Sequence, residues 1–192
     1  MQEAVPQGVG TMAAIIGLDE ESIREVCHQC SYIGVIELAN LNCPGQIVIA
    51  GEVKAVEAAC EKLKAKGALK TVMLAVSGPF HTSMLQPAAE KLEMELKDIT
   101  INDFKIPVIT NVTGKTVESK DNIKTYLRKQ VMSTVLFEKS IRTMLEMGVD
   151  TFVEIGPGKT LSGFVKKINR KAIILNIQDL KSLESTIAKL KK

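Results

Sequence analysis

The order of apolar runs in the first 76 residues constrains the fold of this chain more than any other feature. Four apolar runs have the length of β-strands: residues 11–17, 35–41, 46–51 and 69–76. A helical pattern over residues 22–30, preceded by Asp19 as a candidate N-cap, follows the first run. A Pro-Gly turn follows the second run, and an amphipathic pattern over residues 52–66, ended by Gly67, follows the third. We therefore expect strand, helix, strand, strand, helix, strand.

This element order is the split βαβ, ferredoxin-like pattern, and it is complete within about 75 residues. Beyond His81 the pattern changes, because helices alternate with short, nearly all-apolar strands. Such alternation favours a parallel sheet covered on both faces. The expected elements are helices at 83–98, 121–132, 137–147, from Lys159 and at the C-terminus, and strands at 106–112, 150–156 and 172–177. The chain is thus expected to be an α/β protein of two lobes, with His81 where the lobes meet.

Composition excludes several classes of function. With 192 residues, of which 45% are hydrophobic, the chain is long enough to bury a substantial core. A net charge of +3 and 4% aromatic residues with no Trp argue against a nucleic-acid-binding protein. No apolar run approaches the ~20 residues that span a membrane, and the first ten residues do not resemble a signal peptide. We expect a cytoplasmic protein that binds neither nucleic acid nor membrane.

The four cysteines include a CxxC pair, Cys27 and Cys30, which suggests a zinc or redox site. No second pair accompanies it, and the pair lies within a helical pattern rather than on a turn. The pattern therefore favours free thiols in a reducing compartment, and no metal site is expected.

The segment EIGPGKT, residues 154–160, resembles a phosphate-binding loop because a strand, a Gly-rich turn, Lys-Thr and a helix follow in order. The P-loop pattern requires a further glycine where this chain has Val153. A tight strand-to-helix turn is the favoured interpretation.

The segment SGPFHT, residues 77–82, places a histidine after a Gly-Pro turn at the junction of the two lobes. Clefts between lobes commonly bind substrates, so His81 is a candidate general base. Local features alone leave a second interpretation open, in which His81 is a packed structural residue. A base also needs a nucleophile, and the G-x-S-x-G pattern of a serine nucleophile does not occur in the 192 residues.

Six segments together resemble the acyltransferases that load malonyl groups onto acyl carrier protein. In order they are MQEAVPQGVGTMAAIIGL, ANLNCPGQIVIAG, VSGPFHTSML, PVITNVTG, YLRKQVMSTVLFEKSI and FVEIGPGKTLSGFVKKI. The resemblance implies a ferredoxin-like small subdomain over residues 11–77, inserted in an α/β-hydrolase-like large subdomain. Residues 78–192 would be the C-terminal part of that large subdomain, and residues 1–10 a remnant of it or a linker.

The same resemblance implies a role for four residues. His81 would be the general base and acid of a Ser-His ping-pong mechanism without a cofactor. The main-chain carbonyl of Gln130 would hold the imidazole ring. Phe80 would shape the acyl pocket so that malonyl is favoured over methylmalonyl, and Asn42 would lie in the cleft wall. Malonyl-CoA and acyl carrier protein are the implied partners.

The chain departs from the family pattern at its most reactive position. The family's G-H-S-x-G serine, its malonyl-binding arginine and its oxyanion-hole turn are not found in these residues. We therefore expect a C-terminal portion that is inactive without the N-terminal portion. The alternative is a non-catalytic module that binds acyl carrier protein or a partner subunit. A candidate surface for it is the basic cluster Lys166, Lys167, Arg170 and Lys171, although a solvated helix face is the default interpretation of such a cluster.

Overall fold

The computed structural model describes residues 1, 4–76 and 78–191. These residues form two compact units, Met1–Ser140 and Ile141–Lys192. The division lies within helix α5 (Phe137–Glu146). The subdomain boundary expected at residue 77 lies outside the described residues and stays a prediction.

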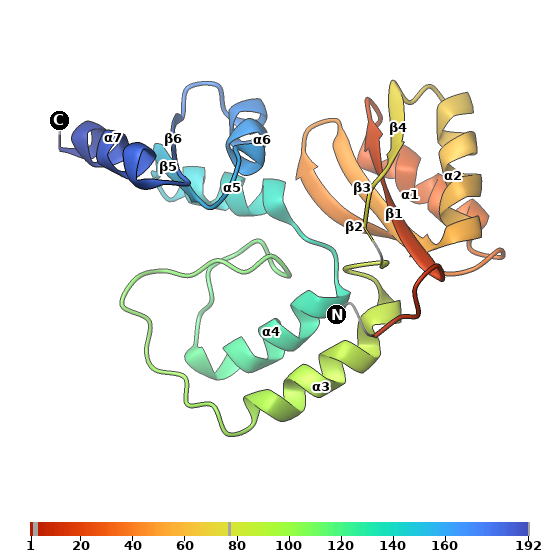
Figure 1. Ribbon diagram of the computed structural model, residues 1–192, viewed down its shortest axis with the longest axis horizontal. Helices are drawn as coiled ribbons and strands as arrows, with labels where there is room; N and C mark the ends of the chain where they lie inside the picture. Colours follow the sequence, from red (N-terminus) through yellow and green to blue (C-terminus); the bar gives the residue numbers. More distant parts are fainter. Residues whose placement is uncertain (2–3, 77, 192) are drawn as a thin grey trace. The chain divides into compact units, whose positions relative to one another are not determined.

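The first unit contains a four-stranded antiparallel sheet with strand order β2-β3-β1-β4 (Figure 1). Its elements are β1 (Gly10–Ile16), α1 (Glu20–Cys30), β2 (Ile36–Cys43), β3 (Gln46–Glu52), α2 (Val53–Ala65) and β4 (Lys70–Met73). The expected element order over the first 76 residues is therefore confirmed. Strand β4 is shorter than the apolar run: Leu74 N still donates to Met12 O of β1, but Val76 N donates to Leu74 O, which makes a tight turn.

Helices α1 and α2 cover one face of this sheet (Figure 1). Their apolar positions recur every three or four residues, so each helix buries a single stripe. The core between the helices and the sheet contains Ile15 and Ile49 from the strands, Ile23 from α1 and Leu63 from α2, all fully buried. Each such side chain contributes about 1.5–3 kcal/mol through its burial.

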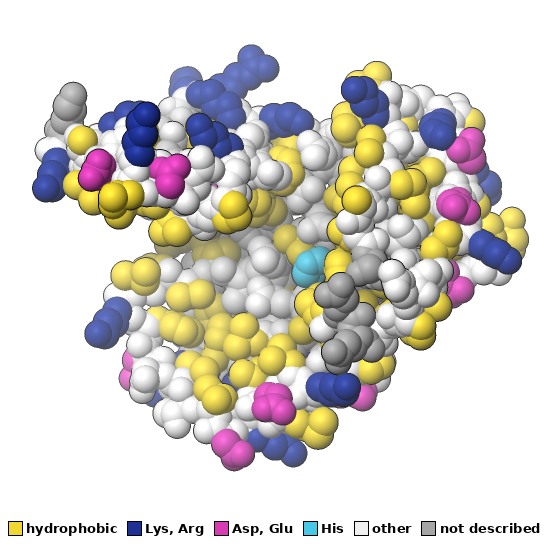
Figure 2. All heavy atoms as spheres, in the orientation of Figure 1, with side chains coloured by type: hydrophobic (Ala, Val, Ile, Leu, Met, Phe, Trp, Pro, Cys, Tyr) yellow, Lys and Arg dark blue, Asp and Glu magenta, His cyan; other side chains and the backbone are white. Residues whose placement is uncertain are grey.

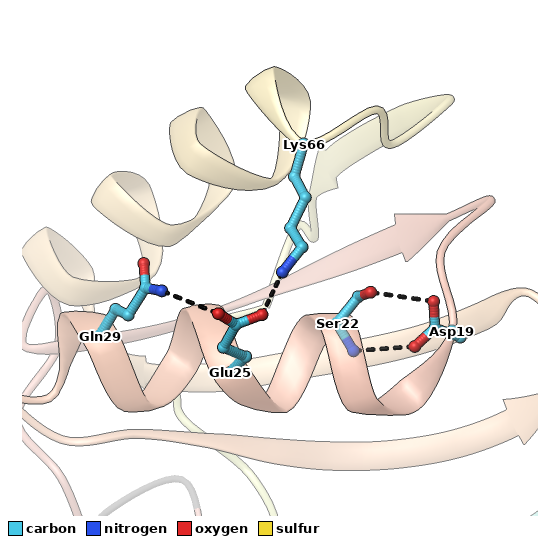
Figure 3. Close-up of polar contacts among 5 residues, drawn as sticks. All are labelled: Asp19, Ser22, Glu25, Gln29 and Lys66. Atoms are coloured by element: carbon cyan, nitrogen blue, oxygen red, sulfur yellow. Dashed lines mark hydrogen bonds and ion pairs between the residues drawn. The ribbon is translucent and has the colours of Figure 1, made fainter.

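Polar contacts define the ends of these helices (Figure 3). The Asp19 carboxylate accepts hydrogen bonds from Ser22 N at 2.8 Å and from Ser22 Oγ at 2.9 Å, which confirms the predicted N-cap. These bonds lower the pKa of Asp19. Glu25 on α1 forms an ion pair with Lys66 at the end of α2. Gly67 follows with φ +104°, which confirms the predicted helix end.

The rest of the first unit is a pair of packed helices and their connections. The elements are η1 (Ser83–Leu85), α3 (Gln86–Leu96), η2 (Lys120–Asn122) and α4 (Ile123–Met132). Helices α3 and α4 lie side by side (Figure 1). Their small core contains Val5, Leu85, Ala89 and Val131.

The strand predicted at residues 106–112 is wrong. Only an isolated bridge between Ile109 and Thr116 forms there, and Ile106 is 73% exposed. An apolar run becomes a strand only when a neighbouring strand pairs with its backbone. In the described residues, Asn111 O accepts a hydrogen bond from Leu136 N and Asn111 N donates to the side chain of Gln130, so the end of this run bonds to a loop and to a side chain instead of to a strand.

The second unit contains a two-stranded parallel sheet. Its elements after α5 are β5 (Thr151–Ile155), α6 (Thr160–Ile168), β6 (Ile173–Ile177) and α7 (Leu180–Leu190). The expectation of a parallel sheet covered on both faces is met only in part, since Ile155 is 79% and Ile173 54% exposed. Figure 2 shows hydrophobic side chains at the surface in many places, in agreement with these exposures.

No helix in the described part of the chain has the length and apolar character needed to cross a membrane.

Candidate active site

The turn that carries His81 is strained and tightly packed. His81 has φ +63° and is the only non-glycine residue with positive φ in the described ranges. Such a conformation costs about 1–3 kcal/mol and persists only where the surrounding structure imposes it. Pro79, two residues earlier, is fully buried against β1, where a Cβ on Gly10 would come within 2.4 Å of the Pro79 ring. The backbone of the turn is thus fixed by contacts on its N-terminal side.

Hydrogen bonds close the turn from within. The buried hydroxyl of Thr82 donates to Pro79 O at 2.7 Å, and Leu85 N donates to Thr82 O at 3.0 Å. The second bond belongs to the start of η1, so the turn continues directly into a helix. His81 itself is half-buried, which leaves part of its ring accessible.

The imidazole of His81 meets the C-terminal end of α4. His81 Nδ1 lies 3.0 Å from the main-chain oxygen of Gln130. A carbonyl oxygen only accepts hydrogen bonds, so Nδ1 carries the proton and Nε2 of the neutral ring is left as an acceptor. Gln130 lies in the last turn of α4, where carbonyls lack intrahelical partners. The imidazole of His81 therefore provides a hydrogen-bond donor for a carbonyl in the last turn of α4, and that carbonyl determines which ring nitrogen carries the proton.

The side chain of Gln130 is also held in place. Its Oε1 accepts a hydrogen bond of 3.0 Å from Asn111 N. Asn111 O in turn accepts from Leu136 N at 2.9 Å. The carbonyl that contacts His81 thus belongs to a residue anchored at both its main chain and its side chain.

Phe80 lies between two parts of the first unit. It packs against the buried cluster on one face of the four-stranded sheet and against the small core of α3 and α4; the sheet cluster contains Met12, Ala14, Ala39, Val48 and Ala50. Phe80 also lines a groove of about 630 Å³ with residues of the N-terminal segment, β1, α2 and the end of the sheet: Gln7, Gly8, Gly10, Thr11, Val53, Ala75 and Val76. The aromatic ring next to His81 therefore limits the space beside the turn.

Asn42 lies near the end of β2, where the pairing of β2 with β3 shifts register between Leu41 and Cys43. It is half-buried.

The EIGPGKT segment forms a tight strand-to-helix turn whose helix end is already occupied. The Glu154 carboxylate accepts hydrogen bonds from Leu161 N at 3.1 Å and Ser162 N at 2.8 Å, at the start of α6. Burial opposes the charge of Glu154, but the hydrogen bonds from Ser162 and Leu161 hold its pKa below the ordinary value. A carboxylate of the chain itself thus takes the place that a phosphate would need.

The thiols of the CxxC pair are buried on α1. Desolvation, with a smaller contribution from neighbouring Cys30, raises the pKa of Cys27 to about 12. All four cysteines carry buried thiols. Within the described ranges, no group of three or more His, Cys, Asp or Glu residues could hold a metal ion.

Comparison with known proteins identifies the family. The family described as "Acyl transferase domain" matches residues 1–188. The chain belongs to the acyl transferase domain family. Two relatives in this family are named malonyl CoA-acyl carrier protein transacylase: one from Bacillus subtilis, 48% identical over 193 residues, and one from Staphylococcus aureus, 42% identical over 185 residues.

Solved acyl transferase structures have the same mixed α/β fold. A malonyl CoA-acyl carrier protein transacylase from Clostridium perfringens superposes with a TM-score of 0.96 at 52% identity, over 100% of this chain and 60% of that chain. A second structure, titled as a malonyl-transacylase in complex with a type II PKS acyl-carrier protein, superposes with a TM-score of 0.94 at 39% identity, over 98% of this chain and 61% of that one. The match to the Bacillus subtilis relative includes 100% of this chain but only 61% of that relative. The match to the Staphylococcus aureus relative includes 96% of this chain and 60% of that relative.

Sequence reasoning placed His81 and Gln130 among the candidates, and the structure brings these two residues into contact. The sequence prediction did not include Glu37, whose carboxylate accepts hydrogen bonds from Ser83 beside the turn. A charged residue that interrupts the apolar run of β2 was the one available signal.

Proposed function

We propose that these residues form the histidine-bearing portion of a malonyl-CoA:acyl carrier protein transacylase of fatty-acid synthesis. The observation that carries the proposal is the hydrogen bond from His81 Nδ1 to Gln130 O, which leaves Nε2 as a base. The fold supports it as well: the βαββαβ unit with strand order β2-β3-β1-β4 is ferredoxin-like, and we assign β5 and β6 to an α/β-hydrolase-like large subdomain.

In the proposed reaction, Nε2 of His81 removes the proton of a serine hydroxyl as the oxygen attacks the malonyl thioester carbonyl. The C–S bond breaks, and the imidazolium protonates the departing thiolate of coenzyme A. In the second half, Nε2 takes the proton of the carrier-protein thiol as the sulfur attacks the serine ester; the ester C–O bond breaks, and the imidazolium returns the proton to the serine oxygen. The serine is supplied by residues outside these 192, because no G-x-S-x-G occurs among them.

The surroundings of His81 suit this role. A neutral carbonyl orients the ring, and the negative end of the α4 macrodipole stabilises the imidazolium that forms in each half-reaction. Phe80 is assigned to the acyl pocket, where its ring would exclude an α-methyl branch, and Asn42 to the cleft wall. Acyl carrier protein is the proposed partner, in line with the complex named for the relative described above.

The test is a chimera in which the part of the Bacillus subtilis relative that this chain does not match is joined to the 192 residues. We expect the chimera to transfer malonyl from malonyl-CoA to acyl carrier protein. Substitution His81→Ala in the chimera should lower kcat by on the order of a million-fold, as loss of a catalytic base typically does. The 192-residue chain alone should show no transfer above background.

The matched control is His28→Ala, which removes the other histidine, an exposed residue of α1. It should leave transfer unchanged. An active chimera that keeps its kcat after His81→Ala would overturn the role of His81, and rapid transfer by the 192-residue chain alone would overturn the expected need for an external serine.

A further inference from the structure

The side chain of Glu37 connects β2 to the turn that carries His81. Its two carboxylate oxygens accept hydrogen bonds from Ser83 N at 3.1 Å and from Ser83 Oγ at 2.5 Å. Ser83 is the first residue of η1, so its N–H has no partner within the helix. Glu37 is half-buried and is the second residue of β2, where it pairs with Ala50 of β3, so the sheet fixes the position of its backbone. The helix start is thus capped by a residue 46 positions away in sequence.

This contact lies two residues beyond the strained backbone of His81. A residue at φ +63° reverts to a more favourable conformation unless both sides of it are held. On the N-terminal side, Pro79 packs closely on Gly10 of β1. On the C-terminal side, Glu37 ties Ser83 to the sheet. The unusual conformation of His81 is therefore maintained between two attachments to the same sheet.

The partner of His81 is attached to the same strand. Just after α4, Thr134 Oγ1 donates to Leu38 O at 2.7 Å and Val135 N donates to Ala39 O at 2.8 Å. Leu41 N donates to Val135 O at 2.9 Å. Residues 38–41 of β2 thus hold the segment that follows Gln130, while Glu37 holds the segment that follows His81. One strand sets the separation of the two groups whose hydrogen bond selects the tautomer of the histidine.

We propose that Glu37 is a positioning residue that keeps His81 Nδ1 on the Gln130 carbonyl and so keeps Nε2 available as the base. The proposal rests on the function proposed above. Without the carboxylate, the Ser83 end of the turn is released, and the imidazole moves relative to the α4 terminus. Misplacement of a catalytic group by about 1 Å is enough to lower a rate by on the order of 100-fold.

The direct test reads the tautomer of His81 without any activity. In the 192-residue chain carrying His28→Asn, His81 is the single histidine, so its two ring nitrogens give an unambiguous ¹H–¹⁵N spectrum. We expect a protonated Nδ1 and an unprotonated Nε2. Glu37→Ala should mix the two tautomers, whereas Glu37→Gln, which retains one acceptor oxygen for Ser83, should restore most of the original spectrum. A Glu37→Ala spectrum identical to that of the parent would overturn the proposal.

The kinetic test uses the chimera. Glu37→Ala should lower kcat by about 10- to 100-fold and leave KM for malonyl-CoA within about twofold, because positioning acts on the transition state and not on substrate binding. The matched control is Glu93→Ala, which removes an α3 carboxylate paired with Arg128 at 3.0 Å. It should preserve both kcat and the tautomer. An unchanged kcat in Glu37→Ala, or an equal loss in Glu93→Ala, would contradict a specific positioning role.

The spectroscopic test and the kinetic test together distinguish a failure of this proposal from a failure of the proposed function. A chimera without transfer, together with a tautomer that depends on Glu37, would refute the function but support the positioning. Normal transfer dependent on His81, together with a tautomer indifferent to Glu37, would refute the positioning alone.

Discussion

The conformation of His81 is the residue-scale feature that no neighbouring pattern explains. Its φ of +63° is normally a glycine conformation, yet the chain has an imidazole there that reaches a helix end. A glycine would be less strained but would provide no base. The strained backbone of His81 is therefore tolerated at a position where the imidazole forms a specific hydrogen bond with Gln130 O.

Substitutions at this position test the strain directly. His81→Gly should be more stable than His81→Ala by about 0.5–1 kcal/mol in urea unfolding, because glycine adopts positive φ freely and this gain exceeds its greater entropy in the unfolded chain. Both variants lose the same hydrogen bond. At Glu57, an exposed residue within α2, the order should reverse, with Gly less stable than Ala by about 1 kcal/mol. Equal stability of the two His81 variants would show that the backbone is not strained.

Buried thiols give a second prediction at this scale. Because burial raises the pKa of Cys27 to about 12, its thiol stays protonated at pH 8 and is a poor nucleophile. The native chain should react with a disulfide reagent at least about 100-fold more slowly than the urea-unfolded chain, in which all 4 cysteines react. Tyr32→Cys, at a site 82% exposed, should add one fast-reacting thiol. Fast reaction of the native parent chain would contradict the burial.

At the scale of the element, capping determines where α1 begins. Asp19 lies outside the helix in extended conformation, and its carboxylate satisfies the Ser22 N–H that the helix leaves free. The amphipathic stripe alone would permit the helix to begin at several nearby residues. The cap selects one of them.

Removal of this cap should destabilise the first unit in a pH-dependent way. The pKa of Asp19 is lowered by its bonds to Ser22, so its contribution is complete above the unfolded pKa near 3.8 and is lost as the pH falls through the folded value. Asp19→Ala should therefore lower the urea midpoint at pH 7, and this effect should become smaller as the pH falls below 3.8. Asp19→Asn, which keeps an accepting oxygen, should remain close to the parent at pH 7. An Asp19→Ala effect that does not decrease as the pH is lowered below 3.8 would contradict this assignment.

At the scale of the whole molecule, the two units differ in how much apolar surface they bury. The four-stranded sheet with α1 and α2 has a continuous core of fully buried side chains. The second unit buries few large side chains, such as Val165 and Leu175, and its sheet has only two strands. Isolated two-stranded pairs are marginally stable in water.

Hydrogen exchange should reveal this difference in the 192-residue chain. Amides of β1 and β3 should be the most protected, and those of β5 and β6 should exchange on the order of 100-fold faster. The amides of α7, which carries the exposed residues Leu180, Ile187 and Leu190, should exchange at least as fast as those of β5. Uniform protection across both units would contradict the prediction.

Local patterns predicted most of the elements because each helix or strand buries one face, and that face repeats with the period of the element. The core positions of α1 and α2 and the cap at Asp19 follow from such repeats. The strand predicted at residues 106–112 was wrong because the prediction used the same local information. An apolar run indicates burial or pairing, but it does not supply the strand that would pair with it.

The candidate site also combines features that local sequence predicts with features that only the tertiary structure determines. Nearby residues were enough to indicate a turn at Gly78 and Pro79, because backbone restrictions act over one or two residues, but they did not indicate the positive φ of His81. Only the tertiary structure could decide that His81 meets Gln130, 49 residues away, and that Glu37 meets Ser83, 46 residues away. Contacts at such separations depend on how strands and helices pack, and no periodicity in the chain records which residues that packing brings together.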